Sequence, residues 1–238
     1  MCTQSWIHAE DGYELFFNRD EAISRAAENP ARELERGGVR VLAPSDGESG
    51  GTWVSVNEHG LCVTLLNAYL PAPERDDYTT RGRLPLELAA QTTLATAADA
   101  LTSTDLRGYR PFHVALVAPR SRALLFTWNG TDLSRDDAES RMPLASSGAD
   151  QEIAKTRRSR HLLDLRAGKP ITADLLARFH ASHEDGPSAW SPCMHSERAE
   201  TRSLCRVSVT EEYVRLTHTP GSPCRTEPLA PLSLKRRA

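Results

Sequence analysis

The sequence carries no excess of basic charge, no long apolar run and no secretory signal. Its 238 residues have a net charge of −3 and a pI near 6.3, so no overall positive field would attract nucleic acid. No segment approaches the roughly 20 apolar residues of a membrane-spanning helix. The chain does not open with a basic segment followed by an apolar one. We therefore expect a cytoplasmic protein without a nucleic-acid partner or a membrane span.

Cysteine is scarce, and no two cysteines form a C-x-x-C pair. The five are Cys2, Cys62, Cys193, Cys205 and Cys224. An odd number at irregular spacing, without a signal peptide, favours reduced thiols in the cytosol. Together with His195 and His218, the last three cysteines follow no known zinc spacing, and no H-E-x-x-H occurs. We expect no bound metal.

Motifs for several other enzyme classes are absent too. There is no G-x-S-x-G elbow, no Walker loop and no G-x-G-x-x-G, which leaves serine hydrolase, NTPase and dinucleotide-binding interpretations without support. We therefore expect no cofactor, and a small molecule as the substrate or ligand.

The pattern of apolar residues predicts antiparallel hairpins with separate helices. Runs rich in β-branched residues flank the turns at 57–60, 119–122 and 210–212, which is typical of hairpins. Helical spacing covers 84–101, and a helix pair is expected over 150–168 and 172–184, with Thr172 as an N-cap. The basic run Arg157 to His161 is interpreted as an exposed helix face. We expect one α+β domain over residues 1–238, with 219–238 a loosely held, proline-rich tail.

The first 21 residues contain the groups of a cysteine nucleophile. If Met1 is removed, Cys2 carries both a thiol and a free α-amine, whose ordinary pKa of roughly 8 suits a general base near neutrality. Arg19 can favour the thiolate through its charge, and Asp20 can orient the amine through a hydrogen bond. In a regular strand, however, Asn18 and Asp20 share one face and Arg19 lies on the other, unless a bulge intervenes.

Several motifs recur in an order typical of one family. They are Met1-Cys2, Asn18-Arg19-Asp20-Glu21, Gly50-Gly51-Thr52-Trp53, Asn67, Thr80-Arg81-Gly82 and Thr201-Arg202-Ser203. With them the chain resembles the NRDE family, which includes the homologues of transport and Golgi organisation protein 2. That family is similar to the N-terminal-nucleophile (Ntn) hydrolases, and distantly to the choloylglycine hydrolases that also begin Met-Cys.

The resemblance implies a fold and a set of site residues. The fold would be an α+β four-layer αββα sandwich of two antiparallel sheets. Cys2 would be the nucleophile, with Arg19, Asp20 and Asn67 as further catalytic residues, Asn67 serving as an oxyanion donor. Residues expected to contact the substrate are Asn18, Gly50, Gly51, Thr52, Trp53, Arg81 and Arg202. The chain departs from the family at Leu144 to Gly148, where the usual asparagine is missing.

Two functions of different classes follow from this resemblance. The first is an Ntn-type cysteine hydrolase or acyltransferase that acts on an amide or thioester of a small metabolite. The alternative is a non-catalytic protein that binds and hands over haem or a lipid-like metabolite, because family members have been linked to haem trafficking. A cysteine or histidine side chain would suit haem iron. A pure interaction module is a third possibility.

Overall fold

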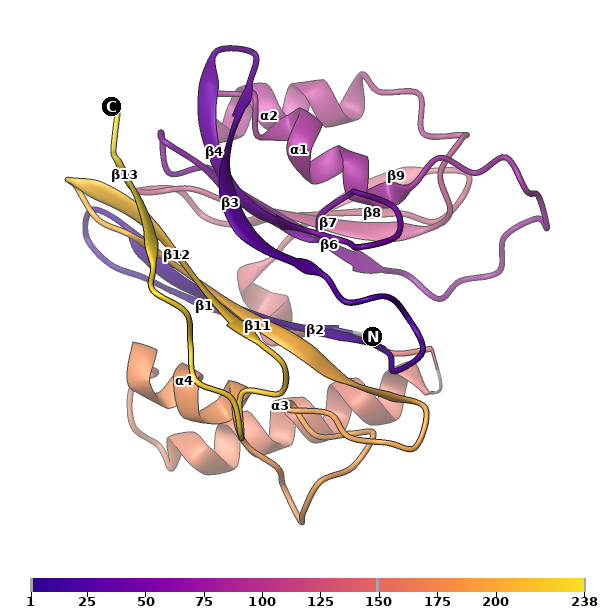
Figure 1. The fold of residues 1–238 in the computed structure, drawn as a ribbon, viewed down its shortest axis with the longest axis vertical. Coiled ribbons are helices and arrows are strands. Elements are labelled where there is room, and N and C mark those ends of the chain that lie inside the picture. Colours follow the sequence, from indigo (N-terminus) through magenta and orange to yellow (C-terminus); the bar gives the residue numbers. More distant parts are fainter. Residues whose placement is uncertain (1, 149, 238) are drawn as a thin grey trace.

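The computed structural model describes residues 2–148 and 150–237 as two antiparallel sheets with helices on their outer faces. Met1, whose removal the cysteine chemistry requires, lies outside these ranges. The six-stranded sheet has the order β10-β1-β2-β11-β12-β13, and the seven-stranded sheet runs from β3 to β9 in sequence order. Figure 1 shows α1 and α2 over the seven-stranded sheet and α3 and α4 over the six-stranded one. The expected four-layer αββα sandwich is confirmed.

The elements have the following bounds. The six-stranded sheet contains β1 (Cys2–His8), β2 (Tyr13–Ala22), β10 (Leu144–Ser146), β11 (Ala199–Val209), β12 (Tyr213–Pro220) and β13 (Leu232–Lys235). The seven-stranded sheet contains β3 (Asn29–Arg36), β4 (Val39–Ser45), β5 (Val54–Asn57), β6 (Cys62–Asn67), β7 (Phe112–Val117), β8 (Leu124–Trp128) and β9 (Leu133–Asp137). The helices are α1 (Leu84–Leu88), α2 (Leu94–Thr102), α3 (Gln151–Arg166) and α4 (Ala173–His180), with short 3₁₀ turns at Arg81–Arg83 and Glu139–Arg141.

Strand alternation divides the buried side chains into three cores. Leu15 and Phe17 of β2 pack between the sheets against residues such as Val56. Phe16, between them in sequence, points to the other face and packs against Phe179 of α4. A third core joins the seven-stranded sheet to α1 and α2. Burying each such side chain contributes about 1.5–3 kcal/mol to the stability of the fold. A shift of one residue in strand pairing would turn these side chains to the wrong face, so their burial fixes the register.

The expected hairpins and the helix pair are confirmed. β5 and β6 flank the first turn, where Gly60 has a φ of 80° and its N–H donates to the Asn57 carbonyl at 2.8 Å. β7 pairs with β8, and β11 with β12. The side chain of Thr172 caps α4 by accepting from the Leu175 N–H at 3.2 Å.

Two segments differ from the sequence-based expectation. The helical pattern over 84–101 is divided into α1 and α2, because Thr93 and Thr96 form a reciprocal capping box that starts a new helix. The tail is not loose throughout: Leu232–Lys235 pair with β12, and Leu234 is buried between the sheets. Strand pairing and the burial of Leu234 both tie this segment to the sheet.

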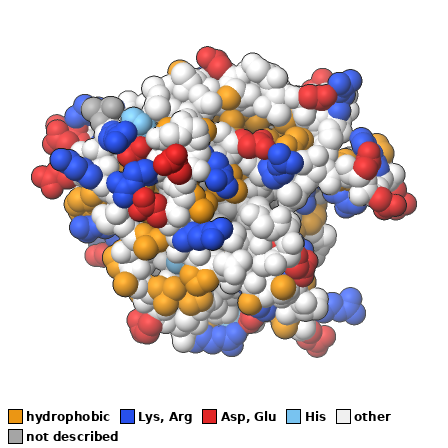
Figure 2. Space-filling view, turned by 45° about the horizontal axis from the view of Figure 1, so that its top comes forward, with side chains coloured by type: hydrophobic (Ala, Val, Ile, Leu, Met, Phe, Trp, Pro, Cys, Tyr) orange, Lys and Arg blue, Asp and Glu red, His pale blue; other side chains and the backbone are white. Residues whose placement is uncertain are grey.

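The surface carries charges of both signs. Figure 2 shows acidic and basic side chains interspersed across the face that it presents, as the small net charge leads one to expect. Within the described residues, no helix is long and apolar enough to cross a membrane.

Candidate active site

Cys2 begins β1, an interior strand of the six-stranded sheet. It lies opposite Arg19 of β2 on one side and Ser146 of β10 on the other. The residue is only 9% exposed. Burial raises the pKa of the Cys2 thiol, and the nearby charge of Asp20 acts in the same direction, whereas the charge of Arg19 lowers it. The thiol is therefore the favoured form in this structure, and a general base is needed to generate the thiolate.

The expected alternation of Asn18, Arg19 and Asp20 is confirmed, because β2 continues past them without a bulge. The register between β1 and β2 is unbroken from Cys2 to His8. The register shift lies instead in β11, between Thr201 and Ser203. Arg19 consequently faces the space between the sheets, whereas Asn18 and Asp20 face the α3–α4 layer.

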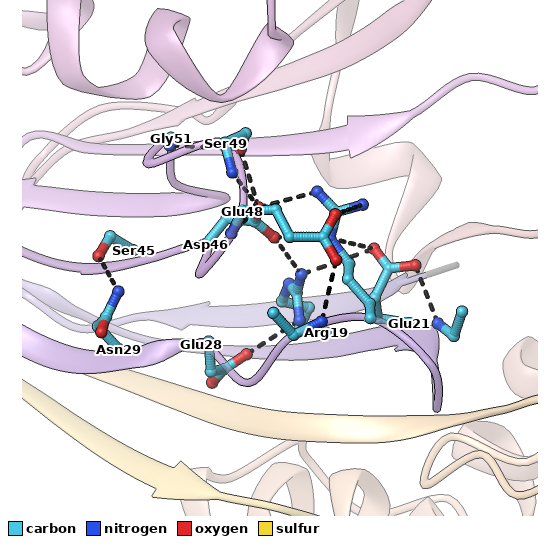
Figure 3. A network of polar contacts seen from close by, with 12 residues as sticks. Arg19, Glu21, Glu28, Asn29, Ser45, Asp46, Glu48, Ser49 and Gly51 are labelled. Atoms are coloured by element: carbon cyan, nitrogen blue, oxygen red, sulfur yellow. Dashed lines mark hydrogen bonds and ion pairs between the residues drawn. The ribbon is translucent and has the colours of Figure 1, made fainter.

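Arg19 is held by carboxylates and an indole ring from the other sheet and its connections. Its guanidinium lies 2.6 Å from an Asp46 carboxylate oxygen and 3.1 Å from one of Glu28, and stacks over the Trp53 ring at 4.6 Å. Figure 3 shows Arg19 directed from β2 toward Asp46 and Glu28. Glu28 also bonds His218 at 2.6 Å. These contacts occupy the two terminal nitrogens of Arg19 and fix its position beside Cys2.

Asp46 connects this guanidinium to a loop. Burial opposes its ionisation, but hydrogen bonds from Arg25 and from the Ser49 N–H and hydroxyl outweigh that effect and lower the pKa of Asp46 well below its usual range. The site thus contains a fixed carboxylate whose charge offsets that of Arg19.

Asp20 is held from the opposite face of the sheet. The Thr201 hydroxyl donates to it at 2.6 Å, and Arg158 of α3 pairs with it at 3.2 Å. Arg158 also donates to the Cys2 carbonyl at 3.1 Å and to the Thr3 hydroxyl at 2.5 Å. This guanidinium therefore joins β1, which carries Cys2, to β2, which carries Asp20.

The interpretation of the basic run as an exposed helix face is wrong for Arg158 and His161, which are 0% and 8% exposed. The signal was present in the sequence: Ala154, Arg158 and Leu162 recur at the four-residue spacing of one helix face, and all three are buried. Arg157 and Arg160 are exposed as expected.

A cavity of about 160 Å³ lies beside Cys2 and brings together most of the predicted site residues. Those that line it are Cys2, Arg19, Asp20, Gly51, Thr52, Trp53, Asn67 and Arg81. The lining also includes Glu21, Thr80 and Gly82, which belong to the family motifs although no contact with a substrate was predicted for them. Arg25, Asp46, Ser49 and Leu65 line it as well, and the sequence did not single them out, because they come together only through the packing of the two sheets.

Two motif glycines meet back to back at this cavity. A Cβ on Gly51 would lie 2.7 Å from the Gly82 Cα, and a Cβ on Gly82 would lie 2.9 Å from the Gly51 Cα. The Thr52 N–H donates to the Gly82 carbonyl at 2.8 Å. The Gly-Gly-Thr-Trp and Thr-Arg-Gly segments therefore require glycine because their backbones touch each other.

The other predicted substrate-binding residues lie outside this lining. The Asn18 amide is buried and donates to the carbonyls of His180 and Pro192, both at 2.8 Å. Gly50 adopts a φ of 67° in the turn that begins at Asp46. Arg202 lies at the β11 register shift and donates to the Ile23 carbonyl at 3.3 Å. These three residues therefore stabilise the structure around the cavity and do not line it.

A larger cavity, of about 260 Å³, has a mainly aliphatic rim that includes Leu66, Ala68, Leu144 and Ala145. Tyr69 also lines it, forms a hydrogen bond with the Asn67 side chain and lies within electrostatic range of Cys2. Burial raises the pKa of Tyr69 to about 12, so its hydroxyl stays protonated near neutrality. Tyr69 is thus the link between the aliphatic cavity and the Cys2 site.

Solved structures of several hydrolases share this fold. A mutant of the conjugated bile acid hydrolase from Clostridium perfringens matches with a TM-score of 0.60 at 10% identity, covering 100% of this chain and 97% of that one. Penicillin V acylase from Agrobacterium tumefaciens matches at 0.52 and 10% identity, over 92% and 83%. The Caenorhabditis elegans N-acylethanolamine-hydrolyzing acid amidase orthologue matches at 0.54 and 12% identity, over 87% and 92%. The chain has the Ntn-hydrolase fold.

Within that fold class the family is defined by sequence. The model of the family Transport and Golgi organisation 2 matches residues 1–185, and the chain belongs to this family. Among curated proteins, none matches the chain.

Proposed function

We propose that this protein is an N-terminal-cysteine hydrolase or acyltransferase acting on an amide or thioester of a small molecule. The observation that carries the proposal is the convergence of Cys2, Arg19, Asp20 and Asn67 on one cavity at the start of an interior strand. A thiol, an ion-paired guanidinium, a carboxylate and an amide are the groups that acyl transfer through a thioester needs. The structural relatives include an acylase and an amidase, which supports this class of reaction.

Catalysis begins with deprotonation of the nucleophile. Once Met1 is removed, the α-amine of Cys2 takes the proton of its own thiol, which burial otherwise keeps protonated. Asp20 lies on the neighbouring strand and is held by Arg158 and Thr201. The bond from Arg158 to the Cys2 carbonyl fixes the backbone from which the amine projects.

The thiolate then attacks the substrate carbonyl. A carbon–sulfur bond forms while the carbonyl electron pair moves onto oxygen, where the Asn67 amide can donate a hydrogen bond. The intermediate collapses as the leaving amine or thiol takes the proton held by the α-ammonium group. Water, or an acceptor amine, next attacks the resulting thioester, giving up its proton to the α-amine and returning the thiol to Cys2.

The two cavities suggest which part of the substrate each one binds. The aliphatic cavity beside Tyr69 suits the apolar part of an acyl group. The polar cavity contains Arg81, a mostly buried cation that donates to the Pro111 carbonyl at 2.8 Å. Since that carbonyl is neutral, Arg81 is the side chain best suited to an acidic group on the leaving portion.

The experiment is an intact-mass measurement on protein expressed without an N-terminal tag, before and after treatment with a thioester acyl donor. We expect loss of Met1 and a single acyl adduct on Cys2. Cys224 is exposed and, in reduced protein treated with a chelator, serves as the internal control, since an indiscriminate reagent would modify it first. A retained Met1, or acylation of Cys224 in preference to Cys2, contradicts the proposal. In that event a haem titration with wild type and Cys2→Ser tests the binding alternative.

A further inference from the structure

Four side chains that could bind a metal meet near the start of β11, outside the lining of the Cys2 cavity. They are His183, Cys193, His195 and Cys224, and one donor atom of each lies within 4.8 Å of all the others. His183 follows α4, Cys193 and His195 lie in the connection to β11, and Cys224 follows β12. Three segments of the chain therefore bring two thiols and two imidazoles together.

The contacts within this cluster have the dimensions of a coordination shell. The His195 Nε2 atom lies 3.5 Å from the Cys193 sulfur and 3.4 Å from the Cys224 sulfur. Zinc bonds of about 2.3 Å to sulfur and about 2.0–2.1 Å to nitrogen, at tetrahedral angles, place such ligand atoms roughly 3.6 Å apart. The His183 and His195 rings are 5.1 Å apart between centroids. The ligands are thus close to the required spacing already.

His183 provides an independent indication of a missing ligand. Its Nε2 atom is buried and has no hydrogen-bond partner among the described residues. A buried polar nitrogen without a partner costs free energy, and binding of a metal ion removes that cost. A disulfide between Cys193 and Cys224 would leave this nitrogen, and the placement of both imidazoles, unexplained.

We propose that His183, Cys193, His195 and Cys224 bind one structural zinc ion. Two thiolates and two imidazoles form a closed tetrahedral set, which is typical of structural rather than catalytic zinc. The proposal replaces the expectation of no metal that followed from sequence spacing. Zinc sites that can be recognised from sequence have two pairs of closely spaced ligands. Here only Cys193 and His195 are close in sequence, so the spacing did not predict the site.

The ion would fix a segment that holds Asp20. Met194 lies between two of the ligands, and its N–H donates to the Thr201 hydroxyl at 2.7 Å while its carbonyl accepts from the Thr201 N–H at 2.9 Å. The same hydroxyl donates to Asp20 at 2.6 Å. The four ligands are therefore positioning residues for the Cys2 site, acting through Met194 and Thr201.

Zinc content is the first test. Untagged full-length protein, reduced and loaded with zinc sulfate, is desalted and analysed by plasma mass spectrometry. We expect about one zinc per chain, and loss of most of it in Cys224→Ser and His183→Ala. Cys205→Ser and Cys2→Ser are matched controls that remove a thiol outside the cluster and should keep the metal. Cobalt in place of zinc should give thiolate charge-transfer bands that Cys224→Ser weakens.

Stability provides the second readout. A chelator should lower the Tm of the wild-type protein, because an ion that binds the native state stabilises it, and should leave the Tm of Cys224→Ser unchanged. Cys224 is exposed, so this variant is expected to fold even if His183→Ala does not. The proposal is overturned if folded wild type binds no zinc, if both variants retain it, or if peptide mapping finds Cys193 and Cys224 joined as a disulfide that binds no zinc after reduction.

Discussion

Arg158 and Asp20 form an ion pair of which both side chains are 0% exposed, with 3.2 Å between Nη2 and Oδ2. Breaking such a pair leaves a buried charge without compensation, which costs about 3–5 kcal/mol. We expect Arg158→Met to lower the free energy of unfolding by that amount, measured by urea denaturation. Arg160→Met is the matched control on the same helix: Arg160 is exposed, and its replacement should change stability by less than about 0.5 kcal/mol. Equal effects for the two variants would contradict this view of Arg158.

Asn67 is expected to stabilise the oxyanion. Removal of one such donor slows acyl transfer by about 10²–10³-fold, so Asn67→Ala should acylate at Cys2 from the thioester donor more slowly by that factor. The rate is measured by time-resolved intact mass. Cys2→Ser should form no thioester and keep the wild-type Tm. An unchanged acylation rate in Asn67→Ala would remove Asn67 from the mechanism.

Gly51 is expected to tolerate no side chain, because a Cβ there would lie 2.7 Å from the Gly82 backbone. Gly51→Ala should lower stability by about 1–3 kcal/mol through overpacking and separate Thr52 from Gly82. Gly108→Ala is the control, since its Cβ would meet only the Thr79 hydroxyl, at 3.5 Å. Thermal denaturation compares the two. A Gly51→Ala variant as stable as Gly108→Ala would show that the two loops can separate without cost.

His180 should make stability depend on pH. It is buried, bonds the Ser5 hydroxyl at 2.7 Å and stacks on Phe16. Burial, aided by the charge of Arg158, lowers the pKa of His180 from 6.5 to about 3. Between these values the unfolded chain binds a proton that the folded protein does not. The stabilisation is therefore complete above pH 6.5 and is lost as the pH falls toward 3, at up to about 1.4 kcal/mol per pH unit.

Urea denaturation at a series of pH values measures this effect. His180→Gln should reduce the slope between pH 6.5 and pH 4, and His59→Gln, on the β5–β6 turn, should leave it as in wild type. If His180→Gln has the wild-type slope, other groups are responsible for the loss of stability in acid.

Much of the fold followed from local patterns in the sequence. The turns at Gly60 and after Val209, and the cap at Thr172, were predicted correctly because each depends on a few adjacent residues. The division of the 84–101 pattern was missed because Leu84 to Leu101 keeps an apolar periodicity across the break, while the Thr93 capping box competes with it. Pairing of β13 with β12 was also missed, because four residues carry too little signal to predict a strand.

The sequence by itself determined Cys2 as the candidate nucleophile, the opposite faces of Arg19 and Asp20, and the family motifs, since all depend on order and alternation along one strand. The tertiary structure decided which distant groups those residues meet. It placed Asp46 and Glu28 on Arg19, Arg158 and Thr201 on Asp20, and Gly82 against Gly51. It also assembled the four proposed zinc ligands from three segments. Such contacts are set by the packing of two sheets and their helices, and spacing along the chain does not encode them.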